Sequence, residues 1–227
     1  MSAARRPREF TAKTAIRRRR RLGRRWLALG AMALLTAVPQ VSAERAGDAA
    51  VGRLTSETER CQECHGSEGI SVADKIPNHA GQPADYLVKQ LRDFQSGARQ
   101  HETMTVMAAD LAPADIVDIA AYFSGRPAPA GTLNGERSAV KILVEQGDDS
   151  RKVPACFSCH GPAGKGRVAD GIAYPLLGGQ RLVYLRSQLR NWKSGDRRNS
   201  PEGVMNRIAG ALSDDEIDGL AAYLATL

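Results

Sequence analysis

The chain has 227 residues, which allows one large domain or two small ones. Its apolar share of 42% is typical of a globular protein, but aromatic residues make up only 5%, so a small domain needs another bulky apolar group. The net charge of +7 comes from residues 1–43, where 11 Lys and Arg stand against Glu9. Residues 44–227 hold 21 basic and 24 acidic residues, a net charge of −3. The basic charge is therefore confined to the N-terminal segment, and the rest of the chain lacks the basic character of a nucleic-acid-binding protein.

Residues 1–43 have the three parts of a secretory signal peptide. Arg17 to Arg21 form an unbroken basic run, residues 27–38 (LALGAMALLTAV) are apolar, and residues 41–43 (VSA) form a small-x-small cleavage signal. A membrane anchor is the alternative, but a span needs about 20 apolar residues. Arg24-Arg25 resembles part of a twin-arginine signal, yet five arginines precede it, so the pair carries little information. We therefore predict cleavage near Ala43 and export to the periplasm.

The four cysteines form two copies of a CxxCH motif. An exported protein with four cysteines can hold two disulfides, a CxxC pair can be a thioredoxin-like redox site, and two pairs can share one zinc ion. A histidine directly after both pairs instead favours covalent haem c, because two thiols one helical turn apart reach one porphyrin and the imidazole reaches its iron. We predict two haem c groups, on Cys61-Gln-Glu-Cys64-His65 and on Cys156-Phe-Ser-Cys159-His160, with each histidine as an axial iron ligand.

The two motifs belong to a long internal repeat, which indicates tandem domains. Residues 77–99 match residues 175–197, sharing Pro, Gly-Gln, Tyr-Leu, Gln-Leu-Arg, Ser-Gly and Arg at the same places, and residues 104–122 match residues 205–223 after a short insertion. We expect the first domain at residues 44–126, a Pro/Gly-rich linker at 127–135 and the second domain at 136–227.

The repeat also indicates the second axial ligands. The second copy holds one methionine, Met205, which is the best remaining side chain for a haem iron. In the first copy Met104 is favoured, because Met-x-x-x-Ala-x-x-Leu recurs with Met205 at the same place. The other candidates are expected in structural roles: Met107 in the core, and His79 and His101 as surface or packing residues. Each proximal histidine is expected to donate to a proline carbonyl, at Pro77 and Pro175.

Every element that we predict is a helix. Helices are expected in chain order at residues 48–60 (weakly), 83–96, from Pro113 onward, at 136–146 and at 182–194. The last helix opens with a capping box at Ser213 and Glu216. No strand is predicted. Domains of this size have only marginal cores, so the haem is expected to serve as the apolar centre.

The order of these motifs, twice over, resembles class I cytochromes c. With the segment 153–162 (VPACFSCHGP), the two domains are similar to the cytochrome c4 family over nearly all of residues 48–227. The resemblance implies an all-α fold of two tandem class I cytochrome c domains, each wrapped around a covalent haem. It also implies periplasmic electron transfer between respiratory complexes, often toward a terminal oxidase, with the haems meeting near the domain interface. The first haem segment, residues 64–69, lacks the fuller loop that follows His160.

Ligation by His and Met fills both axial positions and leaves no open site for oxygen or peroxide. With no Ser-His-Asp set, phosphate loop or acid/base carboxylate pair in the sequence, we expect an electron carrier and not an enzyme. One alternative is a di-haem electron-transfer subunit of a periplasmic dehydrogenase, for example a flavocytochrome c sulfide dehydrogenase. Another is a di-haem peroxidase, in which Met104 or Met205 is not a ligand.

The expected partners are redox proteins, an electron-donor complex and a terminal oxidase or reductase, with peripheral membrane association allowed and no nucleic acid. Residues 44–126 carry a net charge of −5 and residues 127–227 a net charge of +2. We expect each domain to dock a different partner by electrostatic steering. The alternative is that these charges only solvate the two surfaces.

Overall fold

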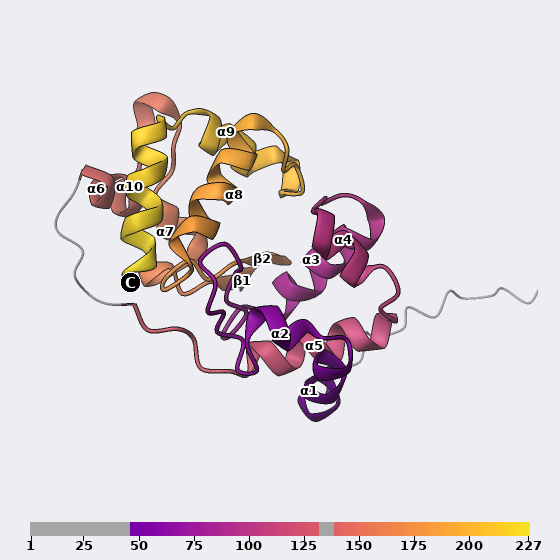
Figure 1. Ribbon diagram of the computed structural model, residues 1–227. Coiled ribbons are helices and arrows are strands. Elements are labelled where there is room, and N and C mark those ends of the chain that lie inside the picture. Colours follow the sequence, from indigo (N-terminus) through magenta and orange to yellow (C-terminus); the bar gives the residue numbers. More distant parts are fainter. Residues whose placement is uncertain (1–45, 132–138) are drawn as a thin grey trace, which may run out of the picture. The chain divides into compact units, whose positions relative to one another are not determined.

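The computed structural model describes residues 46–131 and 139–227 (Figure 1). We call these ranges the first half and the second half. Both belong to one unit that spans residues 44–227. The predicted signal peptide, and the boundary between the predicted linker and second domain, lie outside the described residues. No helix of the described part is long and apolar enough to cross a membrane.

The first half contains five helices in its described residues: α1 (Ala49–Thr58), α2 (Cys61–His65), α3 (Ala84–Ser96), α4 (Glu102–Ala108) and α5 (Pro113–Ser124). The weakly predicted α1 is capped by Asp48, whose carboxylate accepts from two backbone N–H groups of the first turn. Proline opens α5 as expected. In Figure 1, α1 crosses α5, and Gly52 lets the two backbones touch there. The core lies between α3, α4 and α5, with Leu87, Ile116 and Phe123 buried in it.

The second half repeats this pattern with the described helices α6 (Ala139–Gln146), α7 (Cys156–His160), α8 (Leu182–Ser194), α9 (Val204–Gly210) and α10 (Asp214–Ala225). Three short 3₁₀ turns lie at Asp149–Arg151, Pro162–Gly164 and Pro201–Gly203. The Ser213–Glu216 capping box opens α10 as predicted. A separate core joins α6, α8 and α10, with Val144, Ile217 and Leu220 buried in it.

The prediction of no strand is wrong at one place. Strands β1 (Arg167–Ala169) and β2 (Ile172–Tyr174) form an antiparallel hairpin that contacts α3 of the first half (Figure 1). Its turn, Asp170-Gly171, has φ of 52° and 73°, the left-handed geometry that Asp-Gly favours in two-residue hairpins. Three-residue strands are too short to show an alternating pattern, so only the Asp-Gly pair signalled the hairpin.

Candidate haem sites

Each CxxCH motif lies on its own five-residue helix, α2 or α7, which ends at the histidine. The chain leaves each helix at a glycine with positive φ, 81° at Gly66 and 79° at Gly161. A Cβ on Gly66 would lie 2.2 Å from the carbonyl oxygen of Ile70, so only glycine allows this sharp exit. The exit separates the histidine from the loop that follows and leads the chain back toward it.

Both motif histidines are buried, and a proline carbonyl holds each of them as predicted. Nδ1 of His65 lies 2.9 Å from the carbonyl oxygen of Pro77, and Nδ1 of His160 lies 2.9 Å from that of Pro175. A carbonyl accepts only, so Nδ1–H donates and Nε2 keeps its lone pair. Burial lowers the pKa of both imidazoles, against the opposing effect of the carbonyls. Each ring is therefore neutral at pH 7 and can bind a metal through Nε2.

None of the four cysteines forms a disulfide. Burial raises the pKa of Cys61 and of Cys156 to about 11, whereas Cys64 is exposed. Within residues 46–131 and 139–227 no three His, Cys, Asp or Glu side chains are placed to hold a metal ion, so the described geometry offers no shared zinc site. Two thiols and one oriented imidazole on each short helix fit covalent haem c.

The methionines predicted as second ligands occupy equivalent short helices. Met104 lies on α4 and packs against the core of the first half. Met205 lies in the first turn of α9, where its backbone N–H donates to the hydroxyl of Ser200 at 3.2 Å. Both side chains are partly buried, and their ligation of iron stays a prediction.

The remaining candidate ligands take other places. Met107 is 37% exposed on α4, so its expected position in the core is wrong; it lies on the solvent side of this helix. His101 caps α4, with Nδ1 accepting from the N–H groups of Thr103 and Met104 at 3.3 Å each. His79 packs, as expected, but against an unexpected neighbour. Its ring stacks on that of His65, with centroids 3.9 Å apart, and Leu177 occupies the equivalent place in the second half.

The loop after His160 differs from the loop after His65, as the sequence indicated. The β1–β2 hairpin places Tyr174 edge-on to His160, with ring centroids 6.1 Å apart. Arg167 stands over the Tyr174 ring at 5.6 Å, and its Nε donates to the carbonyl oxygen of Cys159 at 3.1 Å. The longer loop of the second half thus places the ring of Tyr174 beside His160 and the guanidinium of Arg167 over that ring.

Two arginines at equivalent places join the halves. Arg99 donates to Gln188 Oε1 at 2.9 Å and to the Tyr184 hydroxyl at 3.2 Å, both in the second half. Arg197 donates to Gln90 Oε1 at 3.0 Å and to the Tyr86 hydroxyl at 3.2 Å, both in the first half. Each arginine also bonds the glutamine of its own half at 2.8 Å. Two guanidiniums therefore share two neutral amide oxygens. In the sequence, these residues stand out only as matching positions of the repeat.

The guanidiniums also change the acidity of a neighbouring phenol. Burial alone would raise the pKa of Tyr184, but Arg99 and Arg197 together lower it below its ordinary value. The positive charges of Arg99 and Arg197 thus both favour the ionised form of the Tyr184 side chain. No ion pair to a carboxylate is found for either arginine within the described residues.

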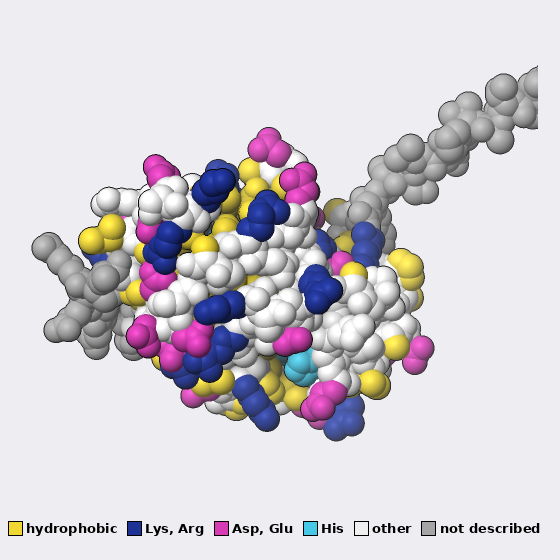
Figure 2. Space-filling view, turned by 90° about the horizontal axis from the view of Figure 1, so that it is seen from above, with side chains coloured by type: hydrophobic (Ala, Val, Ile, Leu, Met, Phe, Trp, Pro, Cys, Tyr) yellow, Lys and Arg dark blue, Asp and Glu magenta, His cyan; other side chains and the backbone are white. Residues whose placement is uncertain are grey.

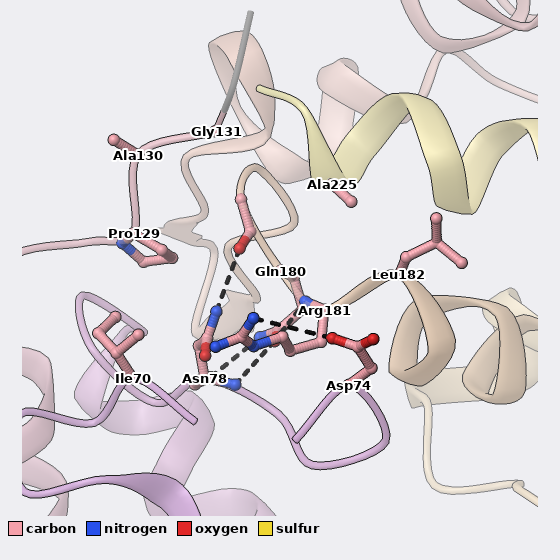
Figure 3. Close-up of a pocket in the computed structure, with 11 residues that line it drawn as sticks. Ile70, Asp74, Asn78, Pro129, Ala130, Gly131, Gln180, Arg181, Leu182 and Ala225 are labelled. Carbon is pink, nitrogen blue, oxygen red and sulfur yellow. Dashed lines mark hydrogen bonds and ion pairs between the residues drawn. The ribbon is translucent and has the colours of Figure 1, made fainter. Parts of the chain in front are cut away.

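A pocket of about 310 Å³ lies between the halves (Figure 3). Asp74 and Asn78 of the first half line it together with Gln180 and Arg181 of the second. Nη1 of Arg181 lies 3.8 Å from Oδ1 of Asp74. None of the motif cysteines or histidines lines this pocket, so it is a feature of the junction and not one of the haem sites.

The chain is similar to known proteins over most of its length. Residues 148–227 match the family model described as Cytochrome c. The thiosulfate dehydrogenase electron acceptor of Stutzerimonas stutzeri (strain A1501) is 36% identical over 207 residues, which are 89% of this chain and 94% of that protein. Cytochrome c4 of Pseudomonas aeruginosa is 36% identical over 187 residues, 82% of this chain and 91% of that protein.

A solved structure is similar over most of the chain. The crystal structure of reduced recombinant cytochrome c4 from Pseudomonas stutzeri matches with a TM-score of 0.73 at 35% identity, covering 80% of this chain and 100% of that one. This match confirms the predicted fold class of two tandem class I cytochrome c domains; the β1–β2 hairpin is the one departure of the described residues from the all-α prediction.

Proposed function

Because the chain belongs to the cytochrome c4 family and is an electron-transfer protein, we propose that each half carries one haem c and passes single electrons. The observation that carries this proposal is the repeated CxxCH helix, whose histidine is buried and held through Nδ1 by a proline carbonyl at 2.9 Å. That hydrogen bond fixes the tautomer and the orientation that a ligating imidazole needs.

The residues that would hold the two groups are those predicted from the sequence. Cys61 and Cys64 would attach the first haem and Cys156 and Cys159 the second, with the axial pairs His65/Met104 and His160/Met205. When bound, haem supplies an iron that is reduced and oxidised by one electron at a time. The chain's part would be to supply a histidine and a methionine to each iron, which would leave no place for a substrate on the iron. We propose no catalytic site of its own.

The domain boundaries and the location follow the same proposal. We assign residues 44–126 and 136–227 to the two haem domains, joined by residues 127–135, and residues 1–43 to a cleaved export signal. The periplasm is the proposed compartment. A basic run, a short apolar stretch and a small-x-small signal support it.

The proposed partners are an electron-donor complex and a terminal oxidase or reductase. On the face in Figure 2, Lys and Arg side chains are interspersed with Asp and Glu. Among the described residues, several of the basic and acidic side chains form ion pairs, as in Arg186–Asp218 at 2.9 Å and Lys193–Asp214 at 2.7 Å. Steering would therefore arise from the difference in net charge between the domains. Electron-transfer rates that do not change with salt for either partner would refute steering.

A second candidate function is the electron-acceptor subunit of a dehydrogenase. It is favoured by the 36% identity to a protein named thiosulfate dehydrogenase electron acceptor. Purification of the chain from its native cells separates the two proposals. A free carrier elutes alone, whereas a subunit elutes with a dehydrogenase and is reduced when the substrate of that enzyme is added.

The carrier function itself is tested by a reductive titration. The purified holoprotein should take up two electrons per chain from a one-electron donor. It should return both electrons, in a stopped-flow mixing experiment, to membranes that contain a terminal oxidase. Uptake of one electron per chain, or reduction that no respiratory membrane reverses, would contradict the proposal.

A further inference from the structure

Each half holds one backbone residue of the other half through a glutamine. Oε1 of Gln180 accepts from the N–H of Asn78 at 2.7 Å, and its Nε2 donates to the carbonyl oxygen of Asn78 at 2.9 Å. Gln82 binds Leu176 in the same way, with distances of 3.0 and 2.8 Å. The glutamines are 3% and 4% exposed. A side-chain amide that bonds both groups of one residue fixes that backbone firmly.

The residue held in this way directly follows the proline that orients the motif histidine. In the peptide unit Pro77–Asn78, the carbonyl accepts from His65 at 2.9 Å, while the N–H donates to Gln180 at 2.7 Å. A peptide unit is planar and conjugated. One rigid group therefore connects a glutamine of the second half to the predicted iron ligand of the first half.

The opposite direction is built identically. In the unit Pro175–Leu176, the carbonyl accepts from His160 at 2.9 Å, and the N–H donates to Gln82 at 3.0 Å. The glutamines belong to the repeated Gly-Gln pairs at residues 81–82 and 179–180. The repeat thus produces two equivalent connections that cross the junction between the halves.

A hydrogen bond donated by a peptide N–H polarises the peptide and makes its carbonyl a better acceptor. A better acceptor at Nδ1–H makes a ligating imidazole more basic, which stabilises ferric over ferrous iron and lowers the reduction potential. We propose that Gln180 and Gln82 are positioning residues that act across the junction. Gln180 sets the histidine hydrogen bond and reduction potential of the first haem, and Gln82 sets those of the second. This inference rests on the proposed haem ligation.

The test compares Gln180→Leu with Gln82→Leu in the full holoprotein. The variants control each other, because each removes the same side chain from the same junction. The readouts are the Nδ1–H proton and nitrogen resonances of His65 and His160 in reduced, ¹⁵N-histidine-labelled protein. Each resonance is assigned through its proximity to Pro77 or Pro175, and the potential of each haem is followed through signals of its own histidine.

Gln180→Leu should shift the His65 resonance and raise the potential of the first haem, changing its reduction equilibrium constant about threefold, while His160 stays unchanged. Gln82→Leu should do the reverse. Loosening of the junction would instead affect the same haem in both variants. The proposal would be overturned if both variants changed the same haem, or if the shift were confined to the histidine of the mutated half. It would also be overturned if neither histidine shifted while both haems were bound.

A second pair of variants covers the case in which the leucine proteins do not take up haem. Gln180→Glu and Gln82→Glu keep an acceptor for the peptide N–H and should lower the potential of the opposite haem. Absence of that crosswise effect overturns the proposal equally. The haem count and spectrum of the wild-type protein are measured first. A wrong ligand set there refutes the proposed function, whereas correct ligands without crosswise effects refute only the role of the glutamines.

Discussion

Gly52→Ala should destabilise the first half through one contact between two helices. Gly52 is buried in α1 where this helix crosses α5. A Cβ at this position would lie 1.9 Å from the carbonyl oxygen of Asp118 and 2.3 Å from its carbon. These are backbone atoms and cannot rotate away, so the helices must move apart by more than 1 Å, roughly the difference from a normal van der Waals contact. Asp48, whose N–H donates to Oδ1 of Asp118 at 2.7 Å, would move with α1.

Overpacking of this kind costs about 1–3 kcal/mol, and a clash with rigid backbone belongs near the upper value. Alanine contributes about 1 kcal/mol in the opposite direction through its higher helix propensity. The expected net loss is about 2 kcal/mol, which lowers the melting temperature of a domain of this size by roughly 10 °C. Because α1 leads directly into Cys61, loss of the haem absorption of the first site should accompany the unfolding.

The assay is denaturation of the holoprotein, followed by circular dichroism and haem absorption. Gly219→Ala is one control, since its Cβ would meet a rotatable side-chain methyl of Val140 at 2.9 Å, and its loss should be smaller. Gly210→Ala is the other, with nothing within 4 Å, and should cause no loss. A Gly52→Ala protein as stable as wild type, or a reversed order of the three variants, would refute the reasoning.

Three further predictions concern charge and ligation. Arg151 donates to Glu216 at 2.8 Å and is the main cause that lowers the pKa of Glu216 from 4.5 to about 2. The ionised Glu216 therefore stabilises the fold above pH 4.5, and this stabilisation is lost as the pH falls toward 2. Glu216→Gln should flatten the acid-unfolding curve between these pH values, and an unchanged slope would contradict the prediction. Arg197→Gln should lower the free energy of unfolding by about 2 kcal/mol, because its charged hydrogen bonds to the other half are lost. Arg198→Gln, at an exposed site, should leave this free energy unchanged. Equal denaturation midpoints for the two variants would exclude the role of Arg197 in joining the halves. Met107→Leu should leave the haem spectrum unchanged because Met107 is 37% exposed, and loss of the thioether ligation band would show that it is the ligand instead of Met104.

The helices and the haem motifs could be predicted because their signals are local. The bounds of α8 at residues 182–194 followed from its match to the helix predicted at residues 83–96 of the first copy, and the capping box located the start of α10. The proline carbonyls at Pro77 and Pro175 followed from the general requirement that a ligating histidine donates through its second nitrogen. Each of these inferences needs only a short stretch of chain and one known chemical preference.

The contacts between the halves could not be predicted in this way. The repeat shows that Gln82 and Gln180 are equivalent, but equivalence does not say which residues meet. Their partners, Leu176 and Asn78, lie 94 and 102 residues away in the chain. The stacking of His79 on His65 is also a tertiary contact, because the loop after α2 folds back on the helix. Met107 was misplaced since a repeat position cannot tell which side of α4 faces solvent.

The most direct test of the central claim is the count and accessibility of the irons. A haem assay of the purified protein should find two covalent haems per chain, and the reduced wild-type protein should bind no carbon monoxide because His and Met occupy both axial positions. Met104→Ala and Met205→Ala should each open one iron to carbon monoxide. A colourless protein, a single haem, or ready binding of carbon monoxide at both wild-type irons would contradict the account.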